Sequence, residues 1–388
     1  MRGECNMKQN YDNPLRRQCF DLVHLAPAQF DLAREALLRL EPEKRLAGIR
    51  RVVVTGCGDS YLAAAQAREV FKHYLKGTGC RMEAVRAIEA ARYLPLDQDA
   101  DGTLLIAISA SGGPARIAEI LQRGKRHGCL TMALTNNGAS RAGTTADLAY
   151  VTNTPEFPDR MPGLRSYLAS MMGLFVLAAV LGEVKSGKTG LCDGLRAALE
   201  AYNGRFAEAL EQIDDSAYAA AVAMKDSKGF EVCADGPLFC CGEFISAKYA
   251  EVSGDKCTVV DSENFWHVNS IMMPQNAYGT IDYVVSDEGN CARMAETISG
   301  QVEKLGRKVL VVADKPAAEL GVTAPVMECI LPVPDRQFRF LLPLYAFVPG
   351  SLVAGYHAAL IEEPYFRGGG KFFDPSINTL GTNGIRVL

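Results

Sequence analysis

The stretch LLIAISASGGPARIAEILQRGKRHGCLTMALT, residues 104–135, decides the fold class of this 388-residue chain. It begins with an apolar run, passes through serine and glycine into a stretch with helical periodicity, and ends in a second apolar run. A buried strand, a helix and another buried strand in this order are typical of a parallel sheet with right-handed crossovers. Upstream, RVVVT at 51–55 predicts a further buried strand before a helical stretch at 60–75. The sequence therefore predicts an α/β fold.

The same pattern returns in the second half of the chain. Residues 281–313, IDYVVSDEGNCARMAETISGQVEKLGRKVLVVA, align with residues 104–135. The alignment places Ser109 on Ser286 at an offset of 177 and Gly128 on Gly306 at an offset of 178. Two nearly equal offsets over a matched strand, turn, helix and strand indicate an internal duplication.

The duplication sets the expected domain boundaries. They are an N-terminal helical segment over 1–44, a first domain over 45–200, a second domain over 201–362 and a C-terminal tail over 363–388 that lies over the site. Two apolar stretches, 168–181 and 340–361, are interpreted as buried helices. The first has about 14 residues, too few to span a bilayer, and the second is interrupted by prolines.

Composition excludes several classes of protein. The net charge is −4 and no basic stripe is present, so we expect no nucleic-acid partner. The twelve cysteines form no C-x-x-C pair and the N-terminus lacks the apolar run of a secretion signal, which favours reduced thiols in a cytoplasmic protein with no membrane association. The five histidines lack the spacing of a zinc site, and we expect neither a metal nor another cofactor.

Two loops rich in glycine and serine follow predicted strands, at residues 56–60 (GCGDS) and 109–113 (SASGG). Loops at the carboxyl ends of parallel strands, joined to helix N-termini, favour an anion such as phosphate. The expected phosphate-binding residues are Gly56, Cys57, Gly58, Ser60, Ser109, Ala110, Ser111 and Gly112. The alternative is that the glycines only make tight turns. GCGDS is not G-x-G-x-x-G, so a dinucleotide site is not indicated.

The duplicated loop provides an internal control. It has the sequence Ser286-Asp287-Glu288-Gly289, with two carboxylates where a phosphate would lie. Because like charges repel, we expect only the first half to hold phosphate. Asp59 in the first loop must then point away from the anion.

With GCGDSY (56–61), IAISASGG (106–113) and the segment 251–267, the chain resembles the tandem SIS (sugar isomerase) phosphosugar-binding family. In length and layout it resembles the fructosamine-6-phosphate deglycases and the isomerase half of glucosamine-6-phosphate synthase. The resemblance implies two SIS domains, each a parallel sheet flanked by helices in a flavodoxin-like three-layer sandwich.

The resemblance also implies a catalytic pair. In the family a glutamate precedes a histidine by 16 residues, and Glu251 and His267 have this spacing, although Val268-Asn269 stands where the family has Gly-Pro. The carboxylate would take a proton from carbon beside a carbonyl, and the imidazole would move the proton that opens a sugar ring. In this family the histidine can come from the neighbouring subunit, so a homodimer or higher homo-oligomer is implied. Without the family, the two residues are an ordinary helix-face glutamate and a capping or core histidine.

Three activities remain open. The family's synthase has a lysine near its C-terminus, and LGTNGIRVL has none, so the resemblance favours a deglycase that cleaves a fructosamine 6-phosphate to glucose 6-phosphate and an amine. The alternatives are an aldose–ketose or amino-sugar phosphate isomerase and a non-catalytic sugar-phosphate sensor. In the tail, Arg367, Lys371 and Arg386 are candidates to meet a substrate carboxylate or are plain surface charges.

Overall fold

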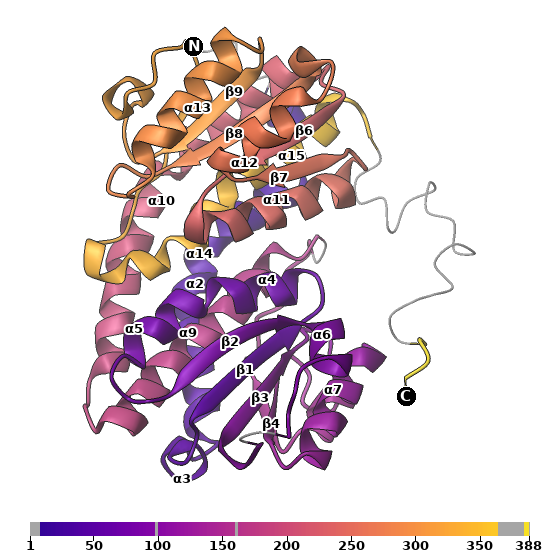
Figure 1. Ribbon diagram of the computed structural model, residues 1–388, viewed down its shortest axis with the longest axis vertical. Helices are drawn as coiled ribbons and strands as arrows, with labels where there is room; N and C mark the ends of the chain where they lie inside the picture. The colour runs from indigo at the N-terminus through magenta and orange to yellow at the C-terminus, as the bar shows by residue number, and fades with distance from the viewer. Residues whose placement is uncertain (1–7, 98–99, 160–161, 364–383, 388) are drawn as a thin grey trace.

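The computed structural model describes residues 8–97, 100–159, 162–363 and 384–387. Two α/β halves stack along the long axis of the molecule, the first from indigo to magenta and the second mainly orange (Figure 1). The described part of the N-terminal segment is helical. It contains η1 (Gln9–Tyr11), α2 (Pro14–Leu38) and α3 (Pro42–Leu46).

The first half is built on a parallel sheet of five strands in the order β2-β1-β3-β4-β5. The strands are β1 (Arg51–Gly56), β2 (Arg81–Arg86), β3 (Thr103–Ile108), β4 (Leu130–Thr135) and β5 (Leu148–Val151). The three predicted strands are confirmed as β1, β3 and β4. The sequence analysis missed β2 because this edge strand is only half-buried and its charged sequence, RMEAVR, lacks an apolar run.

Helices cover both faces of this sheet. They are α4 (Asp59–Gln66), α5 (Arg68–Tyr74), α6 (Ala87–Arg92), α7 (Ala115–Arg126), α8 (Arg141–Thr145) and α9 (Leu164–Ser186), with a short η2 (Ala100–Gly102). The helix predicted over 60–75 is two helices, because at Ala67 the backbone has ψ near −8°. The apolar stretch 168–181 lies in a longer helix than expected. α9 has 23 residues, enough to span a membrane, but 83% of its most apolar window is buried, as in a core helix.

The second half repeats the topology of the first. Its sheet has the order β10-β9-β8-β6-β7, which matches the first sheet strand for strand when counted within each half, and all its pairings are parallel. The strands are β6 (Gly229–Cys233), β7 (Cys257–Val260), β8 (Tyr278–Val284), β9 (Lys308–Ala313) and β10 (Met327–Ile330). This 2-1-3-4-5 order is flavodoxin-like. The predicted fold, two parallel sheets flanked by helices in tandem, is confirmed.

The helices of the second half also follow the repeat. They are α11 (Phe239–Val252), α12 (Ser262–His267), α13 (Cys291–Glu303), α14 (Pro343–Ala346) and α15 (Val348–Leu360). The short helices are η3 (Gly236–Leu238), η4 (Asn269–Ile271), η5 (Gln275–Ala277), η6 (Ala317–Leu320) and η7 (Arg336–Leu341). The apolar stretch 340–361 forms buried helical turns, as predicted.

One hydrophobic core joins the two halves. Val52 and Val54 of β1 point into it, whereas Val53 between them packs against helices on the other face. The 34-residue helix α10 (Leu191–Met224) runs beside both halves and packs against α2, α9 and α15 (Figure 1). The two sheets are therefore held by shared helices and do not form separate cores.

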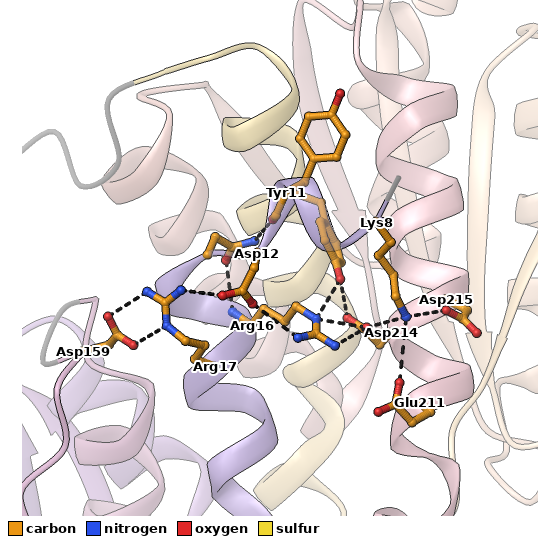
Figure 2. Close-up of polar contacts among 11 residues, drawn as sticks. Lys8, Tyr11, Asp12, Arg16, Arg17, Asp159, Glu211, Asp214 and Asp215 are labelled. Carbon is orange, nitrogen blue, oxygen red and sulfur yellow. Dashed lines mark hydrogen bonds and ion pairs between the residues drawn. The ribbon is translucent and has the colours of Figure 1, made fainter. Parts of the chain in front are cut away.

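A buried carboxylate ties the N-terminal helix to this shared layer. Asp214 of α10 is fully buried and accepts hydrogen bonds from Arg16 at 3.1 Å and from the Tyr356 hydroxyl at 2.7 Å (Figure 2). Lys8 approaches the same carboxylate to 2.8 Å. Because a buried charge is costly unless it is paired, this cluster holds α2, α10 and α15 together.

Candidate functional site

The two loops singled out in the sequence lie at one edge of the first sheet. β1 and β3 are parallel neighbours, with Gly56 paired to Ile108 at their carboxyl ends. The chain turns from β1 into α4 and from β3 into α7 directly beyond these residues. The structure thus brings GCGDS and SASGG side by side, as the strand pattern requires.

Glycine has a steric role in the first loop. A Cβ at Gly56 would lie 2.6 Å from the Cβ of Ser60, and Gly58 has φ of +52°. The glycines therefore make a tight turn. The same turn brings the backbone close to the carboxyl ends of the strands, where a ligand would bind. Desolvation raises the pKa of the Cys57 thiol, and Arg116 lowers it in part. Cys57 is thus a protonated thiol at neutral pH, not an activated nucleophile.

The second loop is held by its own serines. The N–H of Gly112 donates to the Ser109 hydroxyl oxygen at 3.0 Å, and the N–H of Gly113 donates to the Ser111 hydroxyl oxygen at 3.3 Å. Both hydroxyls accept within the loop, so each retains its O–H proton to donate to an anion. The following helix α7 has no side-chain cap, which leaves donors at its N-terminus as well.

The glutamate predicted to be catalytic lies across from these loops. α11 of the second half packs against α4 of the first (Figure 1). The buried Lys248 of α11 has its Nζ 2.7 Å from Glu251 and 2.8 Å from Asp59. The negative charge of Asp59 is therefore paired with Lys248.

The environment of Glu251 makes its carboxylate more basic. Desolvation raises the pKa of this carboxyl, Lys248 opposes the rise, and the negative charge of Asp59 adds to it. A carboxyl with a raised pKa binds a proton more readily than one in water and is suited to proton transfer near neutral pH.

A pocket of about 310 Å³ lies between the first loop and α11. Gly56, Cys57, Gly58 and Asp59 line one side, and Glu243 and Ala247 of α11 line the other. Arg86 closes a third side, stacked 4.5 Å from the ring of Tyr61. Ser109 and Ser111 are not among the lining residues.

The equivalent loops of the second half are filled by carboxylates of the chain itself. Ser286 donates to Asp314 from its N–H at 2.8 Å and from its hydroxyl at 2.6 Å. Ser262 donates in the same way to Asp235, at 2.9 and 2.8 Å. These donors already have acidic partners, so this edge of the second sheet is not arranged for an incoming phosphate.

The other predicted catalytic residue is far more exposed. His267 ends α12, after the edge strand β7, and 70% of its side chain is accessible. Among the described residues its ion-pair partner is Glu263, with Nε2 3.6 Å from Oε1. The described contacts do not join His267 to Glu251 or to the serine loop within one chain.

Two cations at the site were missed in the sequence analysis. Lys248 is fully buried three residues before Glu251, and a lysine on an otherwise apolar helix face was the available signal. Arg116 stands in the first turn of α7, near enough to Cys57 to lower the pKa of its thiol, and forms an ion pair with the buried Glu119 of the same helix. In the tail, Arg367 and Lys371 lie outside the described residues, and Arg386 is exposed.

Comparison with known proteins adds to this geometry. Residues 45–180 match the family model of the SIS domain. No curated protein matches the chain in sequence. The C-terminal domain of glucosamine-fructose-6-phosphate aminotransferase from Francisella tularensis superposes with a TM-score of 0.73 at 16% identity, over 92% of this chain and 98% of that one.

Two further solved structures are similar over nearly the whole chain. Tagatose-6-phosphate ketose/aldose isomerase from Escherichia coli has a TM-score of 0.66 at 16% identity, over 93% of this chain and 95% of that one. Glucosamine-6-phosphate deaminase from Thermotoga maritima has a TM-score of 0.61 at 17% identity, over 89% and 96%. At these identities the similarity establishes the fold of both halves. Residues 45–180 therefore form a SIS domain, and the second half repeats its fold.

Proposed function

We propose that the protein is an enzyme that cleaves a fructosamine 6-phosphate to glucose 6-phosphate and an amine. The observation that carries the proposal is the position of Glu251. Through Lys248, this carboxylate of the second half is connected to Asp59, in the GCGDS turn of the first half. The phosphate would be held by the serine loop, with donors from the Ser109 and Ser111 hydroxyls and the start of α7.

The proposed reaction needs one base and one water molecule. Glu251 takes the proton from C1 of the open-chain ketose, between the amine nitrogen and the C2 carbonyl, which gives an enolamine. Return of a proton to C2, with a proton gained at the C2 oxygen and the amine N–H proton lost, gives an imine at C1. Water hydrolyses this imine to the aldose 6-phosphate and the free amine. Lys248, between two carboxylates, acts as a positioning residue that holds the Glu251 side chain.

In this proposal, the His267 side chain of each active site comes from a second subunit. Its exposed imidazole precedes a short segment with three exposed apolar side chains, those of Val268, Ile271 and Met273. Such side chains favour burial against another surface. We assign that surface to the first half of a partner copy, where Ile88 of α6 lines the pocket beside GCGDS and is itself 47% exposed.

Mixing of inactive variants tests the shared site. Glu251→Gln and His267→Gln homodimers, each inactive, would exchange subunits and recover about a quarter of wild-type activity, since half of the dimers then carry one intact site. Gel filtration with light scattering would establish the dimer. A mixture that stays inactive after exchange, or a monomer that retains full activity, would contradict the shared site.

A second candidate is aldose–ketose isomerisation of a sugar phosphate. A single carboxylate that moves a proton between adjacent carbons serves that reaction as well, and the fold is shared with a ketose/aldose isomerase. The deciding experiment is a coupled assay of glucose 6-phosphate release over a panel of 6-phosphorylated fructosamines, with pairs of sugar-phosphate isomers assayed in parallel. Interconversion without release would favour the isomerase. Binding without any turnover would favour the third candidate, a non-catalytic sugar-phosphate sensor.

A further inference from the structure

A pocket formed by both halves lies away from Glu251. It has a volume of about 540 Å³. The first half contributes α5 and the residues around it, including Lys72, His73 and Lys76. The second half contributes Glu288, in the loop after β8, and η7 with the residues just beyond it.

The duplication gives this pocket a specific place in the fold. Two pairs of glycines with positive φ, Gly58 with Gly236 and Gly128 with Gly306, are each separated by 178 residues. The same separation relates His73 to Glu251. The candidate site at Glu251 lies where α11 of the second half meets the first sheet, and this pocket lies where α5 of the first half meets the second. It is the counterpart of the first site, with an imidazole in place of the carboxylate.

The pocket is lined by several cationic side chains, whereas the loops beside it carry carboxylates. Four cationic side chains line it, those of Lys72, Lys76, Arg336 and Arg339. Lys72 lies 3.4 Å from Glu69, but Lys76 and Arg336 have no ion-pair partner among the described residues. Three acidic side chains, those of Glu69, Asp235 and Glu288, also line the pocket. The four cations still leave its lining with a net positive charge, which favours an anionic ligand.

Arg339 supplies a more specific feature. One guanidinium nitrogen, Nη2, pairs with Asp287 at 2.6 Å. The other two, Nε and Nη1, are buried and have no hydrogen-bond partner in the described part of the chain. Buried N–H donors without acceptors are unfavourable, and a turn of this side chain toward the pocket would let the oxygens of a phosphate accept from them.

The rest of the lining suits a hydroxylated ligand. Glu288, which also has no ion-pair partner among the described residues, can accept from ligand hydroxyls. Desolvation and Lys76 lower the pKa of His73, so its imidazole is neutral near pH 7 and can hydrogen-bond without adding charge. The ring of Phe340, 4.9 Å from that of His73, provides an apolar wall.

We propose that this pocket is a second binding site, which takes the phosphate ester of a small polyhydroxylated molecule such as a sugar phosphate. Lys76, Arg336 and Arg339 bind the phosphate, and Glu288 and His73 contact the hydroxyls. The site does not depend on the reaction at Glu251, because it shares no side chain with that site. It lies beside the second half's sheet and binds its anion through α5 and η7, although Asp235 of the neighbouring loop also lines it.

Calorimetric titration with glucose 6-phosphate tests this site. We expect two molecules bound per chain. Lys76→Ala combined with Arg336→Ala should weaken one binding event by about tenfold or more and leave the other within about twofold. Both side chains are exposed, so this variant should fold, as a thermal melt would verify. The matched control is Arg39→Ala combined with Lys44→Ala, which removes the same charge from another exposed surface and should change neither event.

Other outcomes would overturn the second site. They are a single binding event in the wild type, two unaltered events in the Lys76/Arg336 variant, or equal binding of uncharged glucose in the pocket. Ser109→Ala combined with Ser111→Ala separates this proposal from the proposed function. That variant should lose the other event and the activity while the Lys76-dependent event remains. If it keeps its activity, the proposed function fails and the second site still stands.

Discussion

The loops at the carboxyl ends of the two sheets have the same topology but differ in whether their hydrogen-bond donors have partners. In the first half, Ser109 accepts from backbone and keeps its proton for a ligand, whereas in the second half the equivalent Ser286 donates to Asp314. The residue at the place of Asp314 in the first half is Asn136, a neutral amide that accepts from Thr152 at 2.9 Å. The two halves share the backbone fold, and they differ in that carboxylates of the chain occupy the donors of the second half's loops.

The largest effect should come from Glu251, the proposed base. Glu251→Gln keeps the shape of the side chain but removes the proton acceptor, so kcat should fall by about 10³-fold while the affinity for sugar phosphate stays within about threefold. Steady-state kinetics and calorimetry check this. Glu200→Gln, an exposed helix-face glutamate paired with Arg196 and outside the pocket, is the matched control and should keep nearly full activity. Retained turnover in Glu251→Gln would remove this residue from the mechanism.

The next test compares equivalent glycines of the two loops. Gly112 has φ of +66°, and a Cβ there would lie 1.9 Å from the Ser140 hydroxyl oxygen, whereas Gly289 has open space around it. Gly112→Ala should weaken sugar-phosphate binding by about 10- to 100-fold and lower the free energy of unfolding by about 1–3 kcal/mol. Gly289→Ala should change the free energy of unfolding by less than about 0.5 kcal/mol and leave binding unaltered. Equal effects of the two substitutions on binding would show that the loops are not functionally distinct.

Exchanging Asn136 and Asp314 between the halves should change how each loop treats an anion. Asn136→Asp puts a carboxylate beside the serine loop, where the N–H of Asn136 donates to Ala110, and should weaken sugar-phosphate binding by about three- to tenfold. The reciprocal Asp314→Asn should lower the free energy of unfolding by about 1–2 kcal/mol without changing that affinity. Calorimetry and urea unfolding measure the two effects. Unchanged binding in Asn136→Asp would contradict an anion site at this loop.

The smallest effect is a shift of the pH–rate profile. Glu251 must be ionised to act as a base, so the rate should fall as pH drops through its raised pKa. Asp59 raises this pKa and Lys248 lowers it. Asp59→Asn should therefore move the acidic limb of kcat to lower pH, and Lys248→Met should move it to higher pH. Shifts in the same direction would show that another group controls the limb.

Much of the fold could be predicted from the sequence. The runs RVVVT, TLLIAIS and CLTMALT became central strands because each is apolar along its whole length. Edge strands such as β2 and β10 gave no such signal, since their half-exposed faces tolerate charge. The loops at Gly56 and Ser109 were placed at one edge because neighbouring parallel strands end together.

Parts of the site were beyond prediction from sequence for a physical reason. Lys248 is far along the chain from Asp59, and only the packing of α11 on α4 makes them an ion pair. The exposed position of His267 depends on where α12 lies relative to the rest of the second half. Neither is encoded in a local pattern.

The sequence alone determined the local conformations: which runs become strands, where glycine permits a turn, and that the pattern occurs twice. These follow from side-chain periodicity and backbone sterics, which act over a few residues. Only the tertiary structure decided which donors meet internal carboxylates, which cations remain without partners, and that Glu251 faces the first half. Those outcomes depend on charges that become neighbours once a shared core has brought distant segments together, because electrostatic interactions depend on separation in space and not along the chain.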